Sequence, residues 1–85
     1  MIFFQNNNTT MRRSKTLQQQ AKYYEVANEF EMMDVMLTSW IVGNSRKFKD
    51  YFKALNKENR RKFINYAWCN TEASEFYDII DFLFF

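Results

Sequence analysis

Apolar residues recur along this chain at the three- and four-residue spacing that is typical of α-helices. Between positions 17 and 42 the spacing is unbroken, and its members are Tyr23, Val26, Phe30, Met33, Leu37 and Trp40. Ser14 or Thr16 suits the N-cap, and Gly43 suits the left-handed residue that ends many helices. The pattern therefore predicts one long N-terminal helix over about residues 17–42.

A helix of this length has consequences for packing. At ~1.5 Å per residue it would extend ~39 Å, whereas a globule of this size has a radius of gyration of only ~12 Å. We therefore expect it to project beyond the core or to break, and Thr38–Ser39 is the expected break. The apolar stripe is expected to face the core. A homodimer through the long helix is the alternative, although the stripe is shorter than a typical coiled coil.

Three shorter helices are predicted over about residues 46–55, 57–69 and 72–84, with Ser45, Asn56 and Thr71 as their N-caps. Their expected inward positions are Phe48, Tyr51, Phe52 and Leu55, then Phe63, Ile64, Ala67 and Trp68, then Phe76, Ile79, Ile80, Leu83 and Phe84. The chain has one glycine and no proline to interrupt them. The predicted fold class is all-α, a small single-domain helical bundle over residues 15–85, preceded by a flexible N-terminal arm over residues 1–14.

Composition adds a surplus of apolar surface. The chain has 85 residues, enough for one domain, and aromatic residues make up 20% of it. One small core does not need so many rings, so we expect a partner surface. The C-terminal run Phe82–Phe85 either docks on the body or meets that partner. Because there is a single cysteine and no long apolar segment, a cytoplasmic location without a membrane partner is expected.

Charge is segregated along the chain although the net charge is only +2. Residues 1–24 carry four cations and no acid, whereas residues 25–34 and 72–81 carry four acids each and no cation. Residues 46–62 hold eight cations against Asp50 and Glu58. Such blocks create local potentials that steer charged partners.

The basic segment contains the candidate binding residues, which are Arg46, Lys49, Lys53, Lys57, Arg60 and Arg61. The last three fall in the first turns of the third short helix, where the helix dipole disfavours cations. That placement suggests an anionic partner, either a protein with an acidic surface or the phosphates of a nucleic acid. The alternatives are neutralisation by the chain's own acidic blocks and a solvated surface.

Catalytic chemistry finds little support in the sequence. There is no histidine, and Cys69 therefore has no imidazole to activate it. No glycine-rich loop is present to hold a phosphate, and the paired carboxylates are typical of solvated helix faces. We expect no catalytic residue, no metal site and no cofactor.

The residue types with AT-rich codons greatly outnumber those with GC-rich codons, as in many small bacteriophage proteins. The resulting hypothesis is a non-enzymatic, phage- or mobile-element-type regulator or inhibitor. It would bind a host protein or ribonucleoprotein stoichiometrically, through its basic face and aromatic anchors. The first alternative is a nucleic-acid-binding protein that uses residues 46–62 on phosphates. The second is a helical assembly subunit.

Overall fold

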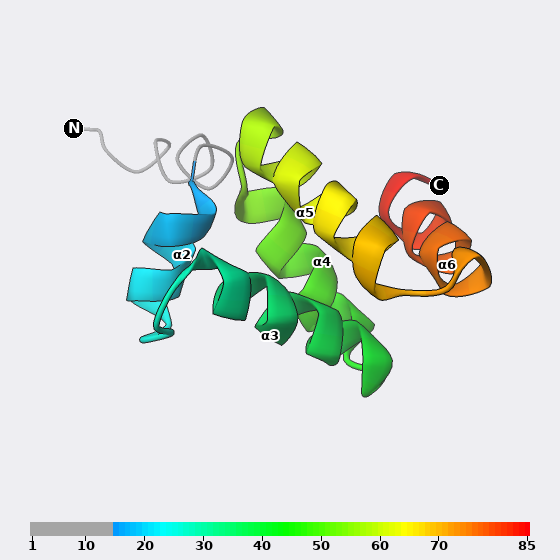
Figure 1. Cartoon of the computed structure of the whole chain (residues 1–85), viewed down its shortest axis with the longest axis horizontal. Coiled ribbons are helices and arrows are strands. Elements are labelled where there is room, and N and C mark those ends of the chain that lie inside the picture. The colour runs from blue at the N-terminus through cyan, green and yellow to red at the C-terminus, as the bar shows by residue number, and fades with distance from the viewer. Residues whose placement is uncertain (1–14) are drawn as a thin grey trace.

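The computed structural model describes residues 15–85, which form α-helices and no strand (Figure 1). The helices are α2 (Leu17–Tyr23), α3 (Glu29–Ile41), α4 (Ser45–Ala54), α5 (Lys57–Asn70) and α6 (Ala73–Phe84). The predicted all-α class is confirmed for this part of the chain. The predicted flexible arm, residues 1–14, lies outside the described residues.

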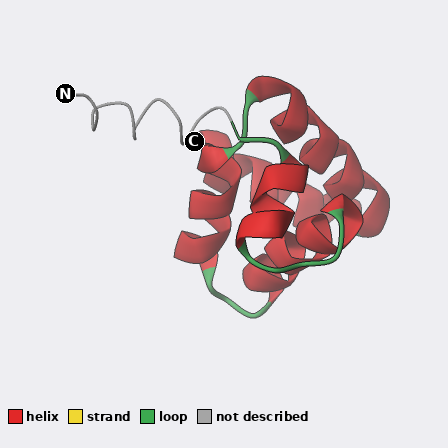
Figure 2. Ribbon diagram, turned by 90° about the vertical axis from the view of Figure 1, so that its left-hand side faces the viewer, coloured by secondary structure: helices red, strands yellow, loops and turns green. Residues whose placement is uncertain are grey.

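The helices pack around α3, α4 and α5, which occupy the middle of the molecule (Figure 1). The short α2 lies at one end, where it packs on α3, and α6 lies at the other end beside α5. Loops of a few residues join successive helices, so that neighbours along the chain are also neighbours in space (Figure 2). α6 reaches the middle of the molecule through Phe82, whose ring lies 5.4 Å from that of Trp40.

The core draws side chains from all five described helices and from the α4–α5 junction. Its buried members are Leu17, Ala21, Met32, Met33, Met36, Leu37, Phe48, Tyr51, Phe52, Leu55, Phe63, Ala67 and Ile79. The predicted inward face of α4 is confirmed. On α5 the prediction is wrong for Trp68, which is 52% exposed because it lies at the margin of the core beside Phe76. On α6 it is wrong for Phe84, which is 54% exposed near the end of the helix.

The three shorter helices begin and end within one residue of their predicted limits. The predicted cap of α5 is confirmed, since Asn56 Oδ1 accepts a hydrogen bond from Asn59 N. At the start of α2, the Thr16 hydroxyl accepts one from Gln19 N, as the second of its two candidate caps predicts. The caps of α4 and α6 differ from those predicted, since Asn44 and Glu72 take the N-cap positions.

The predicted long helix over residues 17–42 is wrong, because the chain turns between α2 and α3. The predicted break at Thr38–Ser39 is also wrong, since α3 runs through it. Glu25 adopts a left-handed conformation with φ of 60°. Val26 N then donates to Ala21 O at 2.7 Å and Glu25 N donates to Lys22 O at 3.2 Å. This is a Schellman motif, which satisfies carbonyls that the end of α2 would leave unpaired.

The same motif ends α3, where Gly43 has a φ of 89°. Asn44 N donates to Ser39 O at 2.8 Å and Gly43 N donates to Trp40 O at 3.1 Å. The predicted role of Gly43 is therefore confirmed. The earlier turn escaped prediction because a glutamate occupies the left-handed position, which L-residues other than glycine and asparagine seldom adopt.

The turn also changes which residues of the apolar stripe face the core. Tyr23 is 69% exposed and Phe30 is 68% exposed, so the prediction that the whole stripe is buried is wrong. The buried residues of α3 are Met32, Met33, Met36 and Leu37. The alternative of a homodimer assumed a single long helix. In its place the structure has two helices with different buried faces.

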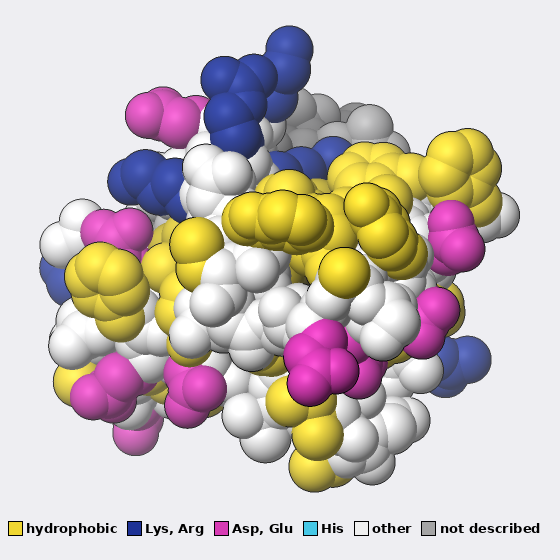
Figure 3. Space-filling model, turned by 45° about the vertical axis from the view of Figure 1, so that its right-hand side comes forward, with side chains coloured by type: hydrophobic (Ala, Val, Ile, Leu, Met, Phe, Trp, Pro, Cys, Tyr) yellow, Lys and Arg dark blue, Asp and Glu magenta, His cyan; other side chains and the backbone are white. Residues whose placement is uncertain are grey.

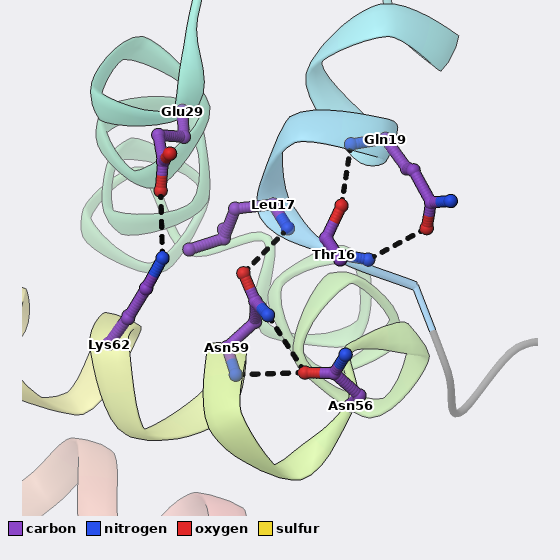
Figure 4. A network of polar contacts seen from close by, with 7 residues as sticks. All are labelled: Thr16, Leu17, Gln19, Glu29, Asn56, Asn59 and Lys62. Carbon is purple, nitrogen blue, oxygen red and sulfur yellow. Dashed lines mark hydrogen bonds and ion pairs between the residues drawn. The ribbon is translucent and has the colours of Figure 1, made fainter.

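A network of polar contacts joins the start of α2 to the α4–α5 junction (Figure 4). Asn59 is 5% exposed, and its Oδ1 accepts a hydrogen bond from Leu17 N at 3.0 Å. Asn59 Nδ2 donates to Asn56 Oδ1 at 2.8 Å. The backbone of Lys15 completes the junction, since its N donates to Ala54 O and its O accepts from Asn56 N. These bonds fix α2 against residues about forty positions further along the chain.

The left-handed glutamate gives a direct prediction. Glu25→Gly should raise the free energy of unfolding by about 1 kcal/mol, because glycine removes the steric cost of the left-handed conformation. Lys22→Gly, inside α2, is the control and should lower it by about 0.5–1 kcal/mol. Urea denaturation measures both. If the two variants were equally destabilised, the turn at Glu25 would be wrong.

The buried asparagine gives a second prediction. Asn59→Ala leaves the buried Leu17 N–H without an acceptor and should lower the free energy of unfolding by about 1–3 kcal/mol. Asn65→Ala, at an exposed position of the same helix, gains the same helix propensity and should stay within about 0.5 kcal/mol of the parent. Equal stabilities of the two variants in urea would contradict the role of Asn59.

The exposure of Phe30 gives a third prediction. Phe30→Asp should fold with a change below about 0.5 kcal/mol, because the side chain is exposed and an acid suits the first turn of α3. Met33→Asp should unfold the domain, because it buries an unpaired charge beside the core. Thermal melting followed by circular dichroism distinguishes the two, and loss of the folded state in Phe30→Asp would contradict the exposed position.

Candidate functional site

The six predicted binding residues lie on two successive helices. Arg46, Lys49 and Lys53 belong to α4, and the other three, Lys57, Arg60 and Arg61, belong to α5. Lys49 and Arg60 are half-buried and the other four are exposed. Lys53 and Lys57 flank the α4–α5 junction, whereas Arg46 lies at the opposite end of α4.

Three of the six surround a pocket of about 190 Å³ at the end of α6. Lys49, Lys53 and Arg60 supply the cations, and the apolar lining comes from Phe52, Leu83 and Phe84. Arg46, Lys57 and Arg61 do not line this pocket. The tertiary structure therefore divides the predicted set into a convergent group and an outlying group.

Arg60 is held in place by the end of α4. Its Nη2 donates to Lys53 O at 2.7 Å and its Nε donates to Phe52 O at 3.2 Å. The guanidinium also lies 5.3 Å from the centroid of the Phe52 ring. A cation at these carbonyls complements the negative end of the α4 dipole. Arg60 therefore supports the pocket wall in addition to contributing charge.

Aromatic rings lie beside these cations. Phe84 is 54% exposed, and its ring meets that of Phe52 edge-on with centroids 5.8 Å apart. Lys49 Nζ lies 5.1 Å from the centroid of the Phe82 ring. The C-terminal run thus docks through Phe82 and exposes Phe84. The sequence signal was present in the run Phe82–Phe85, but only the packing of α6 on α4 brings it to the basic segment.

The acidic residues of the chain pair with few of the cations in the basic segment 46–62. Lys62 Nζ lies 3.6 Å from Glu29 Oε1, an ion pair that links α5 to α3. Within residues 15–85, Lys49, Lys53, Lys57 and Arg61 form no ion pair. The predicted neutralisation by the chain's own acidic blocks therefore holds for Lys62, and for none of these four cations among the described residues.

A second group of rings and cations lies where α2 meets α4. The rings of Tyr24 and Tyr51 meet edge-on with centroids 5.2 Å apart, and Lys47 Nζ lies 5.9 Å and 5.6 Å from them. Burial raises the pKa of both tyrosines, and the neighbouring Tyr51 adds to the effect at Tyr24. Both hydroxyls are therefore neutral near neutral pH. The group is a packing contact between helices.

A larger pocket of about 540 Å³ lies between α3 and α5. Its lining residues are Glu29, Phe30, Met33, Lys62, Asn65, Tyr66, Cys69 and Asn70. Burial raises the pKa of Tyr66, and the negative charge of Asp34 raises it further. The Lys62–Glu29 ion pair joins the two helices beside the pocket. The sequence did not predict this pocket, because it depends on how α3 crosses α5.

Metal-ligating side chains do not cluster in the part of the chain that the structure describes, where no three of His, Cys, Asp and Glu come together. Nor is any helix between residues 15 and 85 both long and apolar enough to cross a membrane.

Comparisons with known proteins give no relative from which a role could be transferred. No protein-family model matches the chain, and neither a curated protein nor a solved structure matches it. The functional argument therefore depends on the chain's own residues.

Proposed function

We propose that this chain is a non-enzymatic binding protein that engages the acidic surface of a partner protein. The observation that carries the proposal is the pocket at the end of α6, where Lys49, Lys53 and Arg60 adjoin Phe52 and Phe84. Cations beside a half-exposed ring suit a partner residue that is apolar and flanked by carboxylates. The ring would supply affinity and the cations would supply orientation.

A protein partner fits this region better than a nucleic acid does. Arg60 already donates to two carbonyls, so fewer donors remain for phosphates. α6 also carries Asp78 and Asp81, both exposed, which would repel a phosphate backbone that followed the helix. An acidic protein surface can meet the cations locally. The biological role that we propose for this binding is that of a regulator of phage or mobile-element type.

Nucleic-acid binding is the second candidate, and one observation favours it. Lys57 and Arg61 are exposed and unpaired within the described residues, close to the start of α5, where the helix dipole is positive. Together with Lys53 they would form a continuous set of phosphate contacts around the α4–α5 junction.

The fourth prediction separates the two functions with Lys53→Glu. A random peptide library selected on the parent protein should yield sequences in which acids flank an aromatic or aliphatic residue. Lys53→Glu should weaken the selected peptide by about tenfold or more in fluorescence anisotropy, because it reverses a charge at the pocket. Lys22→Glu, the same change at an exposed position on α2, is the matched control and should bind as the parent does.

Single-stranded DNA and RNA oligonucleotides serve as the competing probes. For a nucleic-acid-binding protein, log affinity falls with log salt by roughly 0.7–0.9 per phosphate contact, and Lys53→Glu reduces that slope. Tight oligonucleotide binding with this behaviour, and no enrichment of acidic peptides, would reject the protein-partner proposal in favour of the second candidate.

A further inference from the structure

Several aromatic side chains of α5 and α6 are exposed, and ring contacts join three of the aromatic residues in this region. The Trp68 and Phe76 ring centroids lie 5.1 Å apart, and those of Phe76 and Tyr77 lie 6.1 Å apart. Phe84 follows Tyr77 by two helical turns and therefore lies on the same side of α6. Trp68, Tyr77 and Phe84 are 52%, 60% and 54% exposed. We call Trp68, Phe76, Tyr77 and Phe84 the aromatic band. Figure 3 shows hydrophobic side chains running across this face of the molecule.

The aromatic band has charges of opposite sign on its two edges. Its basic edge consists of Lys49, Lys53 and Arg60, which surround Phe84 in the pocket described above. Its acidic edge consists of Asp78 and Asp81, which are exposed residues of α6. Asp81 is four residues after Tyr77 and three before Phe84, so it lies directly beside both rings, and Asp78 lies further round the helix. In Figure 3, Lys and Arg side chains gather above the hydrophobic strip, and Asp and Glu side chains gather to its right and below it.

An apolar strip between a basic edge and an acidic edge is complementary to itself. When a second copy is related to the first by a two-fold axis parallel to the strip, its acidic edge faces the basic edge of the first copy, and the strips meet between them. We propose that a second copy of this chain docks on the aromatic band and forms a two-fold-symmetric dimer. The inference rests on the proposed function, because it names the partner with the acidic surface as another copy of the chain.

The chemistry of the chain favours this occupant. The pocket at the end of α6 requires carboxylates beside an apolar side chain, and Asp78 and Asp81 beside Tyr77 supply that combination. The net charge of +2 adds little repulsion between copies.

The apolar area available limits the strength of this dimer. Three rings at about half exposure, with the less exposed Phe76 between two of them, present roughly 250–400 Å² per copy, compared with about 800 Å² per partner in a standard interface. The charged edges must supply the rest of the interface. The dimer should therefore depend on both protein concentration and salt.

The fifth prediction tests this dimer by exchanging charges between its edges. The basic-edge variant is Lys49→Glu with Lys53→Glu, and the acidic-edge variant is Asp78→Lys with Asp81→Lys. Each variant alone brings like charges together at both edges of a two-fold dimer, so its dissociation constant should rise by about tenfold or more. In an equimolar mixture, the Glu edge of one variant faces the Lys edge of the other. Sedimentation equilibrium should therefore show a heterodimer at least as tight as the parent dimer.

Two controls keep the result specific to this face. Circular dichroism verifies that each charge variant is helical before its sedimentation is measured. Tyr77→Ser removes an exposed ring of the aromatic band and should also weaken the dimer, whereas Phe30→Ser removes an equally exposed ring on α3 and should not. Dimerisation lost in Phe30→Ser and kept in Tyr77→Ser would overturn the inference and assign the contact to α3.

The failures of the two proposals are distinguishable. A parent protein that is monomeric at every concentration overturns the dimer, as does a mixture of charge variants that fails to associate. If that protein still binds the selected acidic peptide through Lys53, the proposed function stands without the dimer. If neither self-association nor peptide binding responds to Lys53, both proposals are wrong.

Discussion

The hydrogen bond from Leu17 N to Asn59 Oδ1 is the constraint on which the rest of the arrangement depends. It joins the first turn of α2 to the first turn of α5, and Asn56 orients the amide that accepts it. Because a buried N–H without an acceptor is costly, the alternatives to this packing are poor. Arg60 follows Asn59 directly and reaches back to the carbonyls of α4. The junction that fixes the fold therefore also positions the cations of the candidate site.

Cations in the first turns of α5 predict an external anion, and the structure gives one of these cations an internal partner instead. Arg60 has partners inside the fold, since it completes the C-terminal end of α4 while lying near the N-terminal end of α5. Lys57 and Arg61 have no such compensation among the described residues. Of the three cations near the start of α5, only Arg60 therefore has a partner inside the fold that explains its position. The argument for a binding partner depends instead on Lys49 and Lys53, which lie beside Phe84.

Helix limits could be predicted wherever a local signal exists. Thr16 and Asn56 cap helices through their own side chains, and Gly43 adopts the conformation that glycine favours. The turn at Glu25 carries no such signal. Asn28, with Glu31 three residues later, does resemble a helix start, but it lies inside the periodic stretch that predicts one continuous helix. Periodicity identified the apolar faces but not the margins of the core, which is why Phe30 and Trp68 were assigned inward. The pocket at the end of α6 required the contact between α4 and α6, which no spacing along the chain encodes.

α6 illustrates how a small domain can couple its stability to a partner. Ile79 is buried and Phe82 packs on Trp40 and Phe48, whereas Tyr77 and Phe84 on the other side of the helix remain exposed. A chain of this size buries a smaller share of its surface than a larger domain does. The docking of α6 therefore matters to the stability of the whole domain. A partner that covers the aromatic band would bind the docked form of α6 and not the detached form. By mass action it would then stabilise the C-terminal helix in proportion to its occupancy, so that binding and folding respond to the same residues.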